Sequence, residues 1–276
     1  MLNITYNIQH LTLRADNEPG MRTFYRDILG LIESQETHQV YSYAFTKSDT
    51  PFLTLQFDGH KNTQLHQGLY HFALLFPDTA SLASIIERLL LIEYPLGAGD
   101  HDVSEAFYLN DPNGNGIELY HDRPKELWQW DNDLVQMGTK DVDAQALLQQ
   151  KQTDWSGFPA KMTIGHLHFV GNNLTRGDEF FIDTLKMALT SAIGDSAHFY
   201  SHNHYHHHHA YNTWLGPDTT LRQAHDTGLL NWTASVDHTY FDLLKTNLTD
   251  QNTASVANEL WLTDPFGSQL IIRRMD

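Results

Sequence analysis

The stretch Ile8-Gln9-His10-Leu11-Thr12-Leu13 returns 156 residues later as Ile164-Gly165-His166-Leu167-His168-Phe169. Both copies are typical of a short β-strand, and both have a histidine at the third position. Other landmarks recur at similar distances: Phe24-Tyr25 as Phe180-Phe181, Gly68-Leu69 as Gly228-Leu229, and Asp111-Pro112-Asn113-Gly114 as Asp264-Pro265-Phe266-Gly267. We therefore expect two homologous halves.

Each half contains a finer repeat. A strand at 10–14 is followed by a helical pattern at 19–29, and a strand at 69–76 by a helical pattern at 79–91. Further strands and turns follow each helix, so the repeating unit is strand, helix and then several strands. Four such units are expected, beginning near Tyr6, Gly68, Met162 and Gly228. The sequence thus predicts an α+β fold.

The halves are separated by a segment of different composition. Residues 123–160 contain Pro124, a Trp128-Gln129-Trp130 cluster and a Gln-rich stretch, and we interpret them as a linker. The predicted organisation is an N-terminal domain of two units at 1–122, the linker at 123–160 and a C-terminal domain of two units at 161–276. The tryptophans of the linker are expected to pack against a domain.

The composition excludes several classes of protein. The chain has 276 residues, 41% of them hydrophobic, and a formal net charge of −17, which disfavours binding to nucleic acid or to an anionic membrane. Cysteine is absent, so disulfides and thiolate chemistry are excluded. Neither a signal-like N-terminus nor a membrane-spanning stretch occurs, and we expect a cytoplasmic protein. The 18 histidines suggest metal or proton chemistry.

Three residues are candidates for a metal site in the first half. His10 and His71 lie on the first strands of units one and two, and Glu118 lies on the last strand of unit two. Side chains that alternate along strands of a curved sheet converge on one cavity. Two imidazoles and one carboxylate form a facial triad that leaves coordination positions open on Fe(II) or Mn(II). Glu118 stands among apolar neighbours, where an uncompensated charge would be costly.

The second half has a histidine cluster but lacks the carboxylate. On an extended strand, His202, His204, His206 and His208 would face one way and His207 and His209 the other. That face is an alternative metal site together with His166. The positions that correspond to Glu118 and His71 are Ile271 and Asn231, which indicates a degenerate copy of the triad.

Stretches of this sequence resemble sequences of the vicinal oxygen chelate superfamily, which includes glyoxalases, bleomycin resistance proteins and extradiol dioxygenases. The resemblance rests on residues 8–13, on Phe24-Tyr25-Arg26-Asp27-Ile28-Leu29-Gly30-Leu31 and on Asp111-Pro112-Asn113-Gly114-Asn115-Gly116-Ile117-Glu118. More narrowly, Gly68-Leu69-Tyr70-His71-Phe72-Ala73, residues 99–106 and Tyr205-His206-His207-His208 with Asn212-Thr213-Trp214 resemble two-domain bacterial catechol 2,3-dioxygenase-like proteins. The resemblance implies four βαβββ modules, paired within each half into a half-open barrel.

The resemblance also implies an activity. It implies an extradiol dioxygenase of aromatic compound catabolism that cleaves a catechol-like ring with O₂, with His10, His71 and Glu118 as metal ligands. Fe(II) is the expected metal, and Mn(II), Ni(II) or Zn(II) are alternatives. Tyr108 is expected to hydrogen-bond the substrate oxygen, and His101 to act as an acid or base. The acid–base histidine of the family has no counterpart at 52–56, whereas a His-rich match lies at His207.

Two other functions remain open at this point. A glyoxalase-like isomerase or lyase would keep the fold and need four protein ligands, with Gln56 as the candidate for the fourth. A non-catalytic protein of the same fold would bind a small molecule without turnover. The sequence leaves open the identity of the substrate and whether the chain forms a homo-oligomer.

Overall fold

The computed structural model describes residues 4–61, 64–248 and 254–275, and it contains four βαβββ modules. The first is β1 (Tyr6–Arg14), α1 (Glu18–Arg22) continued by the π-helix η1 (Thr23–Ile28), β2 (Ile32–Thr37), β3 (Val40–Ala44) and β4 (Leu53–Gln56). The second is β5 (Gly68–Leu75), α2 (Thr79–Leu91), β6 (Gly97–Asp100), β7 (Ser104–Asn110) and β8 (Gly116–Asp122).

The second half repeats this order. The third module is β11 (Thr163–Val170), α4 (Leu174–Asp178) with the π-helix η3 (Glu179–Thr184), β12 (Ala188–Ile193), β13 (Ala197–Ser201) and β14 (His209–Asn212). The fourth is β15 (Gly228–Val236), α5 (His238–Asn247), β16 (Ala254–Val256), β17 (Glu259–Thr263) and β18 (Gln269–Arg274). The predicted α+β class and the four modules are confirmed.

The segment between the halves has little regular structure. It contains the short helix η2 (Lys125–Leu127), the hairpin of β9 (Trp130–Asp131) and β10 (Leu134–Val135), and α3 (Ala144–Gln149). Trp128 is buried beside Val103 and Val135, as expected for a packing residue. Within the described residues, no helix is long and apolar enough to cross a bilayer.

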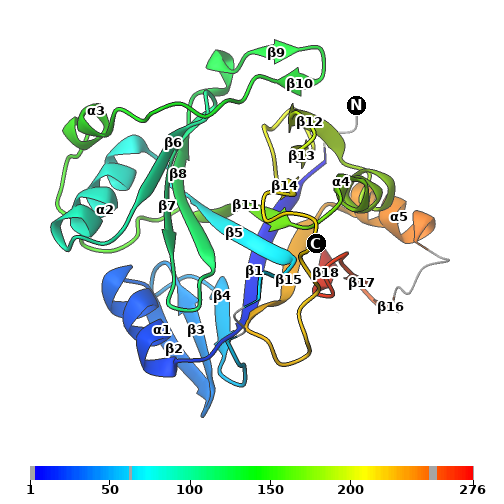
Figure 1. Cartoon of the computed structure of the whole chain (residues 1–276), viewed down its shortest axis with the longest axis horizontal. Helices are drawn as coiled ribbons and strands as arrows, with labels where there is room; N and C mark the ends of the chain where they lie inside the picture. Colours follow the sequence, from blue (N-terminus) through cyan, green and yellow to red (C-terminus); the bar gives the residue numbers. More distant parts are fainter. Residues whose placement is uncertain (1–3, 62–63, 249–253, 276) are drawn as a thin grey trace.

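The modules pair across the halves and not within them. β1 of the first module pairs antiparallel with β15 of the fourth, and β5 of the second with β11 of the third. Figure 1 shows these pairs as blue beside orange and cyan beside green. The expected pairing of units within 1–122 and within 161–276 is therefore wrong, although the division of the chain at 123–160 stays a prediction. Because the modules are nearly equivalent, the first strand of each can pair with the first strand of any other. The repeat in the sequence therefore does not reveal which modules pair.

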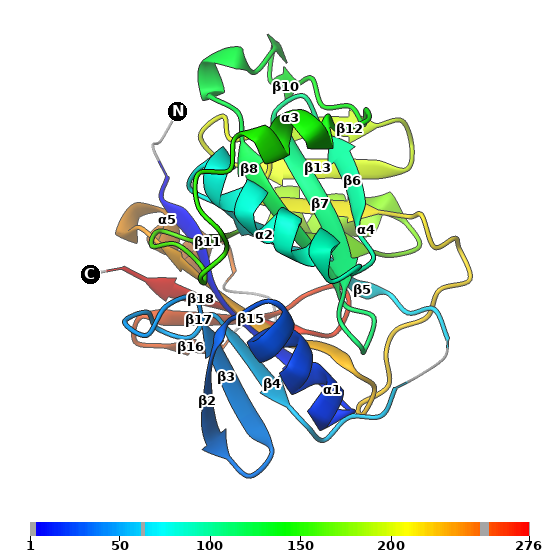
Figure 2. The ribbon, with the colours of Figure 1, turned by 90° about the vertical axis from the view of Figure 1, so that its left-hand side faces the viewer.

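The two pairs form one continuous sheet of 16 strands, because β1 also meets β11 where Ile8 lies opposite Ile164. The helices lie around the outside of the strands, and α2 lies across β7 and β8 (Figure 2). α2 begins at its N-cap Asp78, which accepts a hydrogen bond from the Ser81 amide, and it buries Leu82, Ile85 and Leu89. β11 is buried along nearly its whole length, as expected of a central strand.

A glycine on β11 makes room for a tyrosine side chain of β8. A Cβ atom at Gly165 on β11 would lie 1.8 Å from the hydroxyl oxygen of Tyr120, a buried residue on β8. That hydroxyl also lies 3.0 Å from the hydroxyl of Tyr205. We expect Gly165→Ala to lower the free energy of unfolding by about 1–3 kcal/mol, because the overpacked ring has to move.

Urea denaturation measures this effect. The matched control is Thr163→Ala at the exposed start of the same strand, which should change stability by less than about 0.5 kcal/mol. Equal stability of the two variants would contradict the close contact between Gly165 and Tyr120.

Candidate metal centre

Three buried side chains converge between the second and third modules. His71 on β5, Glu118 on β8 and His166 on β11 are 6%, 3% and 1% exposed. Glu118 Oε2 lies 3.0 Å from Nε2 of both histidines, and the two Nε2 atoms are 3.2 Å apart. In the described part of the chain, these residues form the one group of three or more His, Cys, Asp or Glu donors close enough to share an ion.

The register of the sheet explains the convergence. Ala73 on β5 lies opposite Glu118 on one side and opposite His166 on the other. His71 stands two residues before Ala73 and shares its face of the sheet. The small side chain of Ala73 therefore leaves a space that is flanked by all three donors.

The spacing of the donor atoms fits a metal ion. Atoms bound at about 2.1 Å to one ion, and meeting at right angles, lie about 3 Å apart. Two imidazoles and one carboxylate in this arrangement match the facial triad of redox metals, which leaves further positions open. Both ion pairs of Glu118 are with histidines, so its buried charge lacks an Arg or Lys partner in the described structure. A cation at this point would compensate that charge.

The electrostatics of the group favour an ionised Glu118 and neutral imidazole. Burial by itself raises the pKa of Glu118, but the attraction of His166 and hydrogen bonds from His166 and His71 outweigh it, so the pKa lies well below its usual value. Burial lowers the pKa of His166, although Glu118 opposes the shift. A carboxylate and a neutral imidazole are the forms that bind metal.

The group opens into a cavity of about 260 Å³. Large aromatic and apolar side chains form much of its wall, and they come from both modules and from the linker: Tyr70, Met137, Ile193, Phe199 and Trp214. Two further histidines line it as well. The ring of His207 lies 4.1 Å from that of His166, and the ring of His168 lies 4.7 Å from that of His71. This lining suits a small, flat apolar ligand with polar groups at one end.

His101 and Tyr108 lie at the same cavity. The Tyr108 hydroxyl is 2.6 Å from His101 Nε2, and His101 Nδ1 is 2.8 Å from the carbonyl oxygen of Gly138. A carbonyl only accepts, so His101 donates from Nδ1, and a ring with this one proton accepts the Tyr108 proton at Nε2. Burial, followed by the charge of Glu118, raises the pKa of Tyr108 well above its usual value. Tyr108 is therefore a neutral hydroxyl beside the donor group.

His10 does not join His71 and Glu118. Its Nε2 atom lies 2.9 Å from the Thr54 hydroxyl, within the pair formed by modules one and four. The register explains this. In the second module, Glu118 lies opposite Ala73, which is two residues after His71. In the first module, Thr54 lies opposite Thr12, which is two residues after His10. His10 and Thr54 are thus the counterparts of His71 and Glu118 in the other pair, and the prediction that His10 converges with the other two is wrong.

The same register identifies the counterparts in the remaining modules. Ala210 lies opposite His168, two residues after His166, and Ile271 lies opposite Thr233, two residues after Asn231. Among the four equivalent positions on the last strands, only Glu118 is a carboxylate. The third donor that the sequence placed at His10 is therefore supplied by His166, which the repeat had marked as equivalent to it.

The histidine-rich segment is not an extended strand. β13 ends at Ser201 and β14 begins at His209, and Asn203 and His204 between them have positive φ angles of 57° and 51°. The predicted alternation of faces is therefore wrong, because the chain turns here. The turn directs His207 into the cavity, where an uninterrupted strand would have spaced the histidines along one face.

Comparison with known proteins agrees with this architecture. Residues 7–119 match the model of the Glyoxalase/Bleomycin resistance protein/Dioxygenase superfamily. A catechol-2,3-dioxygenase of Bacillus subtilis (strain 168) is 38% identical over 174 residues, which are 62% of this chain and 61% of that protein. The chain thus spans less than two thirds of the length of this relative.

Solved structures extend the similarity to the whole chain. A Bacillus subtilis protein described as a dioxygenase superposes with a TM-score of 0.61 at 12% identity, covering 97% of this chain and 84% of that one. Glyoxalase I from Zea mays superposes with a TM-score of 0.55 at 10% identity, covering 98% and 93%. At such identities the likeness concerns the fold alone. The vicinal oxygen chelate fold expected from the sequence is confirmed.

Metal content provides a direct test of the donor group. We expect His71→Ala, His166→Ala and Glu118→Ala each to lose a bound divalent metal, because two remaining donors hold an ion far more weakly than three. The measurement is elemental analysis of each purified variant. His10→Ala is the matched control and should keep the metal content of the unaltered protein. Loss of metal in His10→Ala together with its retention in His166→Ala would contradict this assignment.

Proposed function

We propose that this chain, whose residues 7–119 match the Glyoxalase/Bleomycin resistance protein/Dioxygenase superfamily, is an extradiol dioxygenase that cleaves a catechol-like ring with O₂. The observation that carries the proposal is the group of three donors, His71, Glu118 and His166, at one wall of an aromatic-lined cavity. The similarity to a catechol-2,3-dioxygenase supports it.

The proposed metal is Fe(II), with Mn(II), Ni(II) and Zn(II) as ions that the same donors accept. When bound, it supplies open coordination positions for the two oxygens of the diol and for O₂, and a route for electrons between them. His71, Glu118 and His166 would hold this ion at the wall of the cavity, where both substrates would reach it.

The remaining residues of the cavity orient the substrate and handle its protons. The Tyr108 hydroxyl donates to His101 in the resting protein. When substrate is bound, it is proposed to turn its proton to the substrate oxygen nearest Glu118. His207 is proposed to accept the proton that the diol loses on binding, a task for which a neutral imidazole is suited. The rings of Tyr70, Trp214 and Phe199 pack against the flat face of the substrate and exclude water.

The isomerase alternative has less support. It needs four protein donors, and its candidate for the fourth, Gln56, lies at the end of β4 and hydrogen-bonds Asp58 instead. At the position equivalent to Glu118 in the third module stands Ala210, which offers no donor group. A non-catalytic binding protein would need the cavity but not the buried donor group.

Oxygen uptake with catechol tests the proposal. We expect the iron-loaded protein to consume O₂ in step with formation of a ring-opened product, followed by an oxygen electrode and by mass spectrometry. Tyr108→Phe should lower kcat by about 100-fold while it keeps the metal, because one hydrogen-bond donor to the reacting oxygen is lost.

The matched control is Tyr94→Phe, whose hydroxyl bonds the carbonyl of Asn110 elsewhere in the same module. Its activity should equal that of the unaltered protein. A metal-loaded protein that consumes no O₂ with any catechol would overturn the dioxygenase proposal and favour the isomerase, and a protein that binds no metal would favour the binding protein.

A further inference from the structure

A row of hydrogen-bonded side chains leads away from the cavity behind His207. His207 Nδ1 lies 2.7 Å from His206 Nδ1, and His206 Nε2 lies 2.8 Å from Asp122 Oδ1. Asp122 is the last residue of β8, and His206 is fully buried. None of the three is among the donors of the metal group. The row therefore connects the wall of the cavity to the end of a neighbouring strand.

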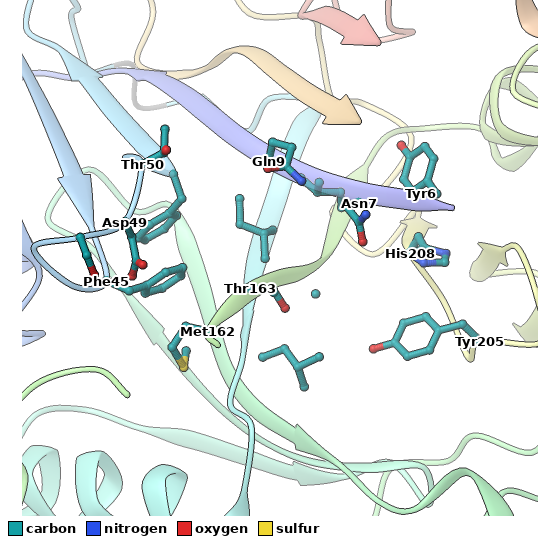
Figure 3. Close-up of a pocket in the computed structure, with 16 residues that line it drawn as sticks. Tyr6, Asn7, Gln9, Phe45, Asp49, Thr50, Met162, Thr163, Tyr205 and His208 are labelled. Carbon is teal, nitrogen blue, oxygen red and sulfur yellow. The ribbon is translucent and has the colours of Figure 1, made fainter. Parts of the chain in front are cut away.

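The far end of the row is held firmly. The Tyr205 hydroxyl donates to the second oxygen of Asp122, Oδ2, at 2.9 Å, so both carboxylate oxygens have a partner. Tyr205 lines a separate hollow of about 530 Å³, shown in Figure 3, which shares no lining residue with the cavity. His206 itself packs between the rings of Tyr205 and Trp128, with ring centres 4.2 and 5.0 Å away. The row thus lies in the wall between the two hollows, and these contacts fix the orientation of its side chains.

The direction of each hydrogen bond follows from the chemistry of its ends. An ionised carboxylate only accepts, so His206 must donate to Asp122 from Nε2. A His206 ring that carries this one proton has a lone pair at Nδ1, and the hydrogen bond there requires His207 to donate from its own Nδ1. A neutral His207 that carries its proton on Nδ1 has a free lone pair on Nε2. Within the described structure, Nε2 of His207 makes no hydrogen bond that would occupy that lone pair.

We propose that Asp122 and His206 are positioning residues that hold His207 in the tautomer with Nδ1 protonated and Nε2 unprotonated. The proposal rests on the proposed function for its catalytic consequence, since an unprotonated Nε2 at the cavity is what a proton acceptor needs. The tautomer itself is a property of the resting protein and does not depend on which substrate is used.

The tautomer is measured directly by nitrogen-15 NMR of the histidine rings. The sample is the wild-type protein loaded with diamagnetic Zn²⁺, and the signals of His207 are assigned by their loss in His207→Asn. The expected spectrum has a protonated Nδ1 and an unprotonated Nε2. A protonated Nε2, or an even mixture of the two forms, would overturn the proposal. This result stands even where the protein cleaves no catechol, so the two proposals fail separately.

Variants of His206 test the consequence for catalysis. His206→Phe keeps a ring in the buried site but removes the acceptor, and we expect kcat to fall by about 100-fold with little change in KM or metal content. His206→Asn carries an amide oxygen near the place of Nδ1 that accepts the same proton. It should recover activity to within about tenfold of the wild type and keep the His207 tautomer.

The matched control is His198→Phe. His198 donates to Asp178 at 2.8 Å, and Asp178 also accepts from a tyrosine, Tyr200. The third module thus contains a second group of histidine, aspartate and tyrosine. It does not line the cavity, and its loss should leave kcat unchanged. Wild-type activity in His206→Phe, or equal losses in His206→Phe and His206→Asn, would overturn the proposal, because the second result would point to packing alone.

Discussion

The antiparallel register of β5 against β11 places Ala73 opposite His166, while β8 on the other side of β5 places Glu118 opposite the same alanine. These two sets of backbone hydrogen bonds bring three donors within about 3 Å of one another and remove them from water. A slip of one residue in either register would turn a donor to the other face of the sheet. The cavity, its histidines and the proposed chemistry all depend on this pairing.

The same register explains why one pair of modules has a donor group and the other does not. In the pair formed by modules one and four, the equivalent positions are occupied by His10, Thr54, Asn231 and Ile271. Without a carboxylate, His10 is satisfied by the hydroxyl of Thr54. That half of the sheet keeps the packing function of the fold, since its inward residues form part of the common core.

The linker and the histidine-rich turn add to the cavity what the repeated modules lack. Met137 and Gly138 of the linker close one side of it, and the carbonyl of Gly138 holds His101. The turn between β13 and β14 supplies His207 to the cavity and His206 to the row behind it. Irregular segments on a rigid sheet are where substrate-handling residues are usually found. Here they come from the linker and from a turn whose counterpart in the first module, residues 45–52, contains no histidine.

The local pattern of the sequence was sufficient to predict the four modules. The alternation of apolar and polar residues, helix caps and turn residues each act over only a few positions. The helix at 79–91, the closing hairpin near Asp111 and the importance of Glu118 follow from such patterns. The modules are nearly equivalent, however, so the repeat alone did not reveal that the second pairs with the third. Only the long-range strand pairing decided that His166, and not its equivalent His10, completes the donor group. Positive φ angles at Asn203 and His204 likewise turned a predicted strand into the loop that brings His207 to the cavity.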